Sequence, residues 1–98
     1  MNSMYGINEN VYNNLINYFK KNTNIITVIL FGSRAKKNNK YNSDIDLCIE
    51  CPKKFRGTIQ YDIDEIIGVY SCDIVFSDSL NEELENQIKR DGIIIYEK

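Results

Sequence analysis

The sequence predicts a single-domain α/β protein of the α+β type, in which helices pack on a mixed β-sheet of about four strands. This prediction depends on the size and composition of the chain, on the order of its apolar patterns, and on the absence of linkers and repeats. The 98 residues lie within the range of one domain, 43% of them are hydrophobic, and only one is proline. Helical and strand-like apolar patterns alternate in the order α-β-β-α-β-α-β. Because the sequence contains no linker and no internal repeat, we assign residues 1–98 to one domain.

The first half of the chain predicts one helix followed by two strands. The helix is expected to begin after Asn8, whose side chain can cap it, and to end near residues 20–22. A β-branched and aromatic run predicts the first strand over residues 25–31. Residues 36–43 contain almost nothing to bury, so we predict a solvated loop there and a second strand over residues 44–50.

The second half of the chain predicts helix, strand, helix and strand. Isoleucines at helical spacing indicate a helix over residues 58–68 that ends at a glycine. A third strand, which starts at residue 69 or 72, is expected to end at residue 76. The run Ser79-Leu80-Asn81-Glu82 fits a capping box, with Ser79 as the cap of a third helix that ends at residues 91–92. Residues 93–96 then form a short closing strand.

The stretch that points to function lies between the first two predicted strands. It begins with Gly32-Ser33 and, ten residues later, reaches Asp44-Ile45-Asp46. Successive side chains of a strand point to opposite faces, so Asp44 and Asp46 would share a face roughly 7 Å apart. Two carboxylates held that close repel each other, and a divalent cation relieves the repulsion. The stretch therefore predicts a site for Mg²⁺ and a nucleoside triphosphate.

A second Asp-Ile-Asp triplet, at residues 62–64, provides an internal control. It falls within a predicted helix, where residues two apart lie about 200° apart around the axis. Its carboxylates would diverge and could not share an ion. We interpret this triplet as part of a solvated helix face.

Asp73 is the candidate for a third carboxylate. It is an ionisable residue in an otherwise apolar strand, where a lone carboxylate would be costly to bury. Two Mg²⁺ ions ~3.5–4 Å apart can stabilise both the attacking and the leaving oxygen of an in-line displacement, and a third carboxylate would complete the second ion's site. The alternative interpretation of Asp73 is an exposed position on an edge strand.

The residues at and after Gly32 could bind phosphate. Glycine lets the backbone approach a phosphate closely, and Ser33 can donate both its hydroxyl and its N–H, although a Gly-Ser pair is also a common turn. Four of the twelve basic residues follow within seven positions, namely Arg34, Lys36, Lys37 and Lys40. This cluster could neutralise a triphosphate, or it could simply belong to a solvated loop.

Composition argues against several other classes of function. The net charge of −2 gives no indication of binding to nucleic acid or to a membrane surface. The apolar runs are too short to span a membrane, and the N-terminus lacks the features of a signal peptide, so we expect a cytoplasmic protein. The chain has no histidine, which excludes Ser-His and Cys-His nucleophilic machinery.

Cys48 and Cys51 match the C-x-x-C spacing of redox and zinc sites. On a single strand, however, these two side chains would point to opposite faces of the sheet. We therefore predict that they are buried small hydrophobic residues rather than metal ligands or a redox pair.

Taken together, Gly32-Ser33, Asp44-Ile45-Asp46 and Asp73 resemble the motif set of the nucleotidyltransferase superfamily that includes DNA polymerase β and kanamycin nucleotidyltransferase. The short chain is similar to the minimal members of that superfamily, the MntA-like antitoxin group. The resemblance covers about residues 10–96 and implies the nucleotidyltransferase fold. Many relatives carry a second glycine after Gly-Ser-Arg-Ala, whereas Lys36-Lys37 stand at that place in this chain.

The resemblance also implies roles for individual residues. Gly32 and Ser33 would hold the β,γ-phosphates of ATP, and Asp44 and Asp46 would bind both Mg²⁺ ions. Asp73 would complete the site of the catalytic ion. The implied reaction is attack of an acceptor hydroxyl on the α-phosphorus of ATP, with transfer of AMP and release of pyrophosphate.

The minimal members typically pair with a HEPN-domain toxin and adenylylate one of its tyrosines. The resemblance therefore implies a Mg²⁺-dependent protein adenylyltransferase that acts as the antitoxin of a type VII-like toxin–antitoxin pair, in a hetero-oligomer with the toxin. The alternative is a catalytically silent antitoxin that neutralises the toxin by binding alone. Transfer to a small molecule such as an aminoglycoside is disfavoured, because no second domain would shape a pocket for it.

Overall fold

A four-stranded mixed sheet forms the centre of the computed structural model, which describes residues 3–98. The strand order is β5-β4-β3-β6. β4 and β5 run parallel, whereas β3 is antiparallel to both β4 and β6. The predicted mixed sheet is therefore confirmed. Its strands are β3 (Thr27–Phe31), β4 (Ile45–Glu50), β5 (Cys72–Phe76) and β6 (Ile93–Glu97).

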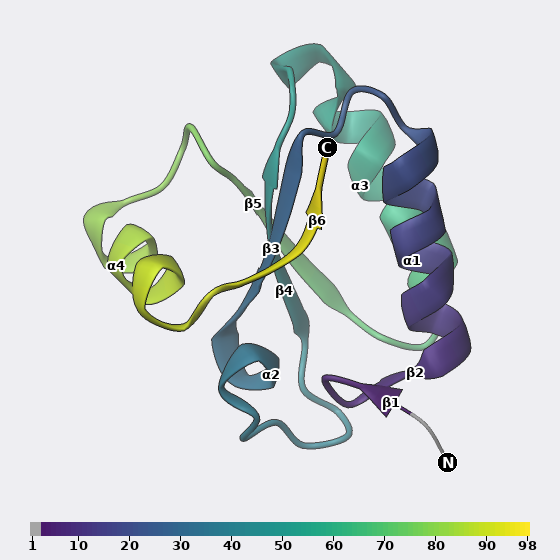
Figure 1. The fold of residues 1–98 in the computed structure, drawn as a ribbon, viewed down its shortest axis with the longest axis vertical. Helices are drawn as coiled ribbons and strands as arrows, with labels where there is room; N and C mark the ends of the chain where they lie inside the picture. The colour runs from purple at the N-terminus through teal and green to yellow at the C-terminus, as the bar shows by residue number, and fades with distance from the viewer. Residues whose placement is uncertain (1–2) are drawn as a thin grey trace.

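Helices cover both faces of this sheet (Figure 1). The helices α1 (Glu9–Lys21) and α3 (Arg56–Ile67) pack on one face, and α4 (Glu82–Asp91) packs on the other. A short 3₁₀ turn, η1 (Lys53–Phe55), precedes α3, which connects the parallel strands β4 and β5. No helix within residues 3–98 combines the length and the apolarity that a membrane crossing requires.

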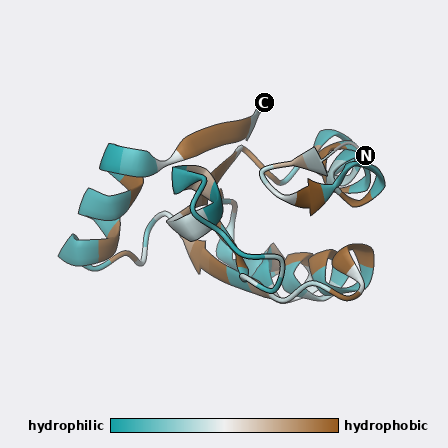
Figure 2. Ribbon diagram, turned by 90° about the horizontal axis from the view of Figure 1, so that it is seen from below, coloured by the Kyte–Doolittle hydropathy of each residue, from teal (hydrophilic) through white to brown (hydrophobic). Residues whose placement is uncertain are grey.

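The larger of two hydrophobic clusters lies between the sheet and the helices α1 and α3. Alternate residues of β4 point into it, and those on the opposite side point towards α4 or solvent, as the two-residue period of a strand requires. Figure 2 shows the result: the strands are mostly hydrophobic, whereas α4 and the segment around α2 are mostly hydrophilic. The central residues of the larger cluster are Leu15, Phe19, Leu30, Ile45, Leu47, Ile49, Ile59 and Ile63.

Several of the predicted helix ends are confirmed, and one predicted cap is wrong. The Asn8 side chain accepts hydrogen bonds from the N–H groups of the next helical turn, and Gly68 ends α3. The cap of α4, however, is Asn81, whose side chain accepts from the N–H of Leu84, and not Ser79. The Ser79 hydroxyl instead donates to Asp78 within the preceding turn, so it cannot serve the helix.

Several other boundaries differ from those predicted by one or two residues. The second strand begins at Ile45 rather than at residue 44, so Asp44 lies just outside it, and the closing strand extends to Glu97. The first strand begins at Thr27, because the N–H of Ile25 still donates to the Asn22 carbonyl at the end of the preceding helix. The helix α3 begins two residues early, directly from the 3₁₀ turn. Gly32 begins a short helix, α2 (Gly32–Lys36), which shortens the predicted loop over residues 36–43 by one residue.

A small hairpin at the beginning of the chain was not predicted. The strands β1 (Ser3–Met4) and β2 (Ile7–Asn8) pair antiparallel through a turn at Tyr5-Gly6. Both turn residues have positive φ, +57° at Tyr5 and +75° at Gly6, which is the pattern of a type I′ turn. Two-residue strands are too short to show a period, and tyrosine is not a typical residue for this turn.

Candidate active site

Asp46 and Asp73 occupy paired positions on the parallel strands β4 and β5. Residues directly opposite each other in a sheet share a face, and this is the face on which Cys48 packs towards α4. Asp46 is half-buried, whereas Asp73 is exposed because β5 is an edge strand. Asp44 is also exposed and lies one residue before β4. Asp73 therefore lies exposed on an edge strand and is also paired with Asp46, so the two interpretations of this residue do not exclude each other.

The electrostatic environment of Asp46 favours a cation nearby. Burial raises the pKa of Asp46 to about 6, with further increases from the negative charges of Asp73 and Asp44, while the positive charge of Arg34 acts in the opposite direction. A bound cation would relieve this repulsion. The oxygen-only donor set matches the preference of Mg²⁺.

Within residues 3–98, no group of three or more acidic, histidine or cysteine side chains is close enough together to hold a metal ion. A Mg²⁺ site does not require such a group, because Mg²⁺ usually takes one or two carboxylates and completes its shell with phosphate oxygens and water. Asp46 and Asp73 are the two carboxylates that the strand register brings together. The residues therefore fit a Mg²⁺ ion that is shared with a triphosphate.

Gly32 lies directly against the carboxylate of Asp46. Its φ of +75° falls in the left-handed region, and a Cβ at this position would overlap Asp46 Oδ2. The strand register explains this proximity, since Phe31, the residue before Gly32, pairs with Asp46. Ser33 follows in the first turn of α2, where the main-chain N–H groups have no partner within the helix. The structure thus brings Gly32 against Asp46, with Ser33 as the next residue in the chain.

Arg34 does not lie where a phosphate-binding role would need it. Its side chain is fully buried, at 0% exposure. The guanidinium donates hydrogen bonds to the carbonyl oxygens of Tyr5, from Nη1 at 3.1 Å, and of Ser43, from Nη2 at 2.6 Å. It also lies 5.4 Å from the ring centroid of Tyr70. No sequence signal separates this buried arginine from the exposed lysines that follow it.

The lysines after Arg34 are exposed, as expected for a solvated loop. Lys36 occupies the last turn of α2, and Lys37 ends that helix with a φ of +63°. The loop then closes on itself, because the N–H of Lys40 donates to the Ser43 hydroxyl and the N–H of Ser43 donates to the Lys40 carbonyl. None of these lysines forms an ion pair within the part of the chain that the structure describes.

The second Asp-Ile-Asp triplet is more than a solvated helix face, although its carboxylates do diverge. Asp62 accepts a hydrogen bond from the hydroxyl of Tyr18 at 2.7 Å, which joins α3 to α1. Asp64 points the other way and borders a cavity of about 240 Å³ that Asp73 also lines. The sequence interpretation was therefore right about geometry and wrong about Asp62, since helical period alone does not show what a side chain meets.

A larger cavity lies beside the segments that lead into β4 and β5. Its volume is about 500 Å³, which falls in the range of small-molecule pockets. Tyr41 and Val69, two of its lining residues, are 90% and 98% exposed. The sequence did not indicate this cavity, because its two walls lie far apart along the chain. It is lined by Tyr41, Asn42, Ser43, Val69, Tyr70 and Ser71.

The predicted burial of the C-x-x-C pair is confirmed. Cys48 and Cys51 are both buried, at 3% and 7% exposure. They belong to different hydrophobic clusters, Cys48 on the α4 side and Cys51 on the side of α1 and α3.

Comparisons with known proteins point to one family and one fold. The sequence profile described as "Polymerase beta, Nucleotidyltransferase" matches residues 13–98. A search of curated proteins gives no match. Several solved structures are similar, and at identities near 20% this similarity establishes the fold alone.

Several of these structures are toxin–antitoxin complexes. One, described as a toxin–antitoxin with AMP-PNP, matches with a TM-score of 0.71 and 21% identity over 89% of this chain and 73% of that chain. An MntA–HepT complex matches with a TM-score of 0.64 and 19% identity over 90% and 71%. A tri-AMPylated Shewanella oneidensis HEPN toxin in complex with an MNT antitoxin matches with a TM-score of 0.64 and 17% identity over 90% and 71%.

Proposed function

The chain belongs to the polymerase β-type nucleotidyltransferase family, and from this premise we propose that it transfers AMP from ATP to a tyrosine hydroxyl of a HEPN-domain toxin. The transfer would silence the toxin, so the protein would act as an antitoxin within a hetero-oligomer. The observation that carries the proposal is the pairing of Asp46 with Asp73 in register, beside a glycine whose missing side chain leaves room at that carboxylate. We place the reaction in the cytoplasm, where ATP is abundant.

Two of the similar structures support the choice of substrate and partner. One contains AMP-PNP, an analogue of ATP, together with a toxin–antitoxin pair. Another contains a HEPN toxin that carries three AMP groups, together with its MNT antitoxin. These descriptions apply to those proteins, and the shared fold makes the same chemistry the leading proposal for this chain.

Asp44 and Asp46 would bind two Mg²⁺ ions, and Asp73, which the strand register pairs with Asp46, would complete the site of the catalytic ion. When bound, Mg²⁺ supplies charge neutralisation for the triphosphate and lowers the pKa of the acceptor hydroxyl. Gly32 and Ser33 would hold the β,γ-phosphates, with the Ser33 hydroxyl as a donor. Lys36, exposed on the last turn of α2, would add positive charge near the departing pyrophosphate.

In the proposed step, the tyrosine oxygen forms a bond to the α-phosphorus of ATP. The bond between that phosphorus and the oxygen bridging to the β-phosphate breaks, and pyrophosphate leaves with the bonding electron pair. The tyrosine proton passes to Asp73, because Asp73 is the exposed carboxylate of the pair and can be reached from a partner protein. Asp46, which is half-buried against Gly32, stays on the side of the nucleotide.

Mass spectrometry of the partner toxin tests the proposal. The toxin is incubated with this protein, ATP and Mg²⁺, and we expect its mass to increase by one or more AMP units. The variant Asp44→Asn/Asp46→Asn should give no increase. Glu82→Gln/Glu83→Gln is a matched control, because it removes the same charge from exposed residues of α4 and should modify the toxin normally.

The same double variant separates catalysis from simple binding. Without a mass increase on an authentic partner toxin, the proposed transfer is wrong. If Asp44→Asn/Asp46→Asn still protects growing cells from the toxin as well as the wild type does, the protein neutralises by forming a complex.

A further inference from the structure

Arg34 connects several segments that converge near the carboxylates. Its guanidinium donates to the carbonyl oxygen of Ser43, the residue immediately before Asp44. It lies over the ring of Tyr70, three residues before Asp73. The two segments are also joined directly, since the N–H of Ile45 donates to the Ser71 carbonyl at 2.8 Å. One buried side chain therefore contacts both segments that lead into the acidic positions.

The third segment that Arg34 contacts is the turn of the β1–β2 hairpin. The other guanidinium nitrogen donates to the carbonyl of Tyr5, whose φ of +57° is unusual for a bulky residue. The hairpin then reaches Tyr70, because the N–H of Asn8 donates to the Tyr70 hydroxyl at 2.9 Å. Backbone strain of this kind persists only where the surroundings hold it in place.

Stability alone does not account for a charged side chain at this position. Arg34 is fully buried, and within residues 3–98 its guanidinium forms no ion pair with a carboxylate and its Nε has no hydrogen-bond partner. A buried cation that is only partly satisfied is costly, and an apolar residue of similar volume often stabilises a fold at least as well. The planar fork of arginine, however, can hold two carbonyls at a fixed separation.

We propose that Arg34 is a positioning residue that fixes the segments before Asp44 and Asp73 relative to each other. The guanidinium contacts residues 40–45 through the Ser43 carbonyl and residues 69–73 through the Tyr70 ring, and it adds to the direct bond between Ile45 and Ser71. Its effect on catalysis rests on the proposed function, whereas its effect on the two segments does not. A lysine would keep the charge, but its shorter, non-planar ammonium lacks the fork geometry that reaches both carbonyls while the guanidinium lies over the Tyr70 ring.

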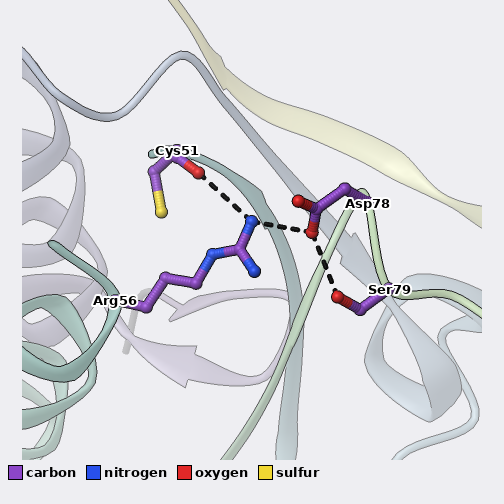
Figure 3. A network of polar contacts seen from close by, with 4 residues as sticks. All are labelled: Cys51, Arg56, Asp78 and Ser79. Atoms are coloured by element: carbon purple, nitrogen blue, oxygen red, sulfur yellow. Dashed lines mark hydrogen bonds and ion pairs between the residues drawn. The ribbon is translucent and has the colours of Figure 1, made fainter. Parts of the chain in front are cut away.

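Arg56 offers a matched control in the same molecule (Figure 3). It donates from Nη2 to the Cys51 carbonyl at 3.3 Å and to Asp78 at 2.7 Å, and its guanidinium lies 4.5 Å from the Phe76 ring centroid. Its Nε also has no partner in the described residues. Arg56 thus shares with Arg34 a bonded carbonyl, a nearby ring and, within residues 3–98, an unpaired Nε, but it also forms an ion pair with Asp78 and lies at the opposite ends of β4 and β5.

Amide hydrogen exchange of the full chain provides the first test. At a temperature where circular dichroism shows all variants folded, Arg34→Met should exchange about 10- to 100-fold faster over residues 40–45 and 69–73, the size expected for the loss of hydrogen bonds to a charged group. Arg34→Lys should show an intermediate increase over the same residues. Arg56→Met should leave both segments at the wild-type rate. If Arg34→Met does not fold, the exchange rates of Arg34→Lys are compared with those of the wild type and of Arg56→Met instead.

Kinetics of AMP transfer provide the second test. Arg34→Lys should lower kcat by up to about 10²-fold with little change in KM for ATP, because it misplaces the carboxylates rather than the phosphate contacts. Arg56→Met should change neither constant. Wild-type exchange over both segments in the Arg34 variants, or equal acceleration in Arg56→Met, would overturn the proposal. A wild-type protein that modifies no toxin refutes the proposed function, while the exchange result still decides the role of Arg34.

Discussion

Gly32 and Asp46 are so close together that a Cβ at position 32 would overlap the Asp46 carboxylate. The proximity arises from the sheet, since Phe31 on β3 pairs with Asp46 on β4 and the chain turns into α2 at the next residue. The phosphate-binding residue and the metal-binding residue of the proposed site are therefore held by the same pair of strands. A change at either one must affect the other.

Gly32→Ala should accordingly destabilise the protein and abolish AMP transfer. The substitution forces an L-residue into a φ of +75° and displaces the Asp46 carboxylate, at a cost of about 1–3 kcal/mol for the backbone alone. Gly57→Ala is the matched control, because it lies in α3 with no atom within 4 Å of the added Cβ. That control should stabilise the protein by about 0.5–1 kcal/mol. Urea unfolding measures both, and equal effects would contradict the inferred overlap.

The raised pKa of Asp46 predicts a distinctive dependence of stability on pH when divalent cations are absent. The pKa of Asp46 is about 6 in the folded protein and 3.8 by reference when unfolded. Between these values the folded state retains a proton that the unfolded state has lost. This group therefore contributes stability below pH 3.8 that is lost as the pH rises towards about 6.

Asp46→Asn should remove this contribution, because the amide does not titrate. With EDTA present, the melting temperature of the variant relative to the wild type should increase as the pH rises through the window from about 4 to 6, and then stay constant. Using the difference between the two proteins cancels the contribution of carboxylates that lie far from Asp46. A difference that does not change with pH would show that Asp46 titrates normally.

The sequence was sufficient to predict an element of secondary structure where a strong local signal and the tertiary structure agree. The helix α1 combines a capping asparagine, a broad apolar face and terminal lysines, and it forms as predicted. The strand position of Asp46 followed from its apolar neighbours. The pairing of Asp46 with Asp73 did not, because two strands separated by a helix can be aligned in several registers.

The features that the sequence missed depend on contacts between distant segments. In the sequence, Arg34 looks like one of several cations in a solvated loop. In the structure it is fully buried, in contact with the hairpin turn at Tyr5 and the ring of Tyr70. The hairpin itself has strands of two residues, too short for any period. Asp62 accepts a hydrogen bond from the hydroxyl of Tyr18 on another helix, a contact that its position in the helix does not reveal. The roles of Arg34 and Asp62 thus depend on residues that contact them in the fold but lie far away in the sequence.

The hydrogen bond between Tyr18 and Asp62 should contribute measurably to stability. Burial and the bond to Asp62 raise the pKa of Tyr18 to about 12, so the hydroxyl remains a donor throughout the neutral range. Tyr18→Phe should cost about 1 kcal/mol, because Asp62 is then left half-buried without this donor. Tyr61→Phe, at a position 65% exposed, should have almost no effect. Thermal unfolding of both variants checks this, and an equal small effect would argue against the bond.

Lys37 should be a site at which glycine stabilises the protein. Its φ of +63° ends α2 in the left-handed region, which costs an L-residue roughly 1–2 kcal/mol, while glycine adopts it without strain. After allowing for the greater flexibility of glycine in the unfolded chain, Lys37→Gly should gain about 0.5–1 kcal/mol and raise Tm by a few degrees. Lys36→Gly is the matched control, because it removes the same charge from a helical residue and should lower Tm instead. Opposite shifts in calorimetry would support the geometry of the loop, whereas a loss of stability in Lys37→Gly would show that Lys37 does not hold the left-handed conformation.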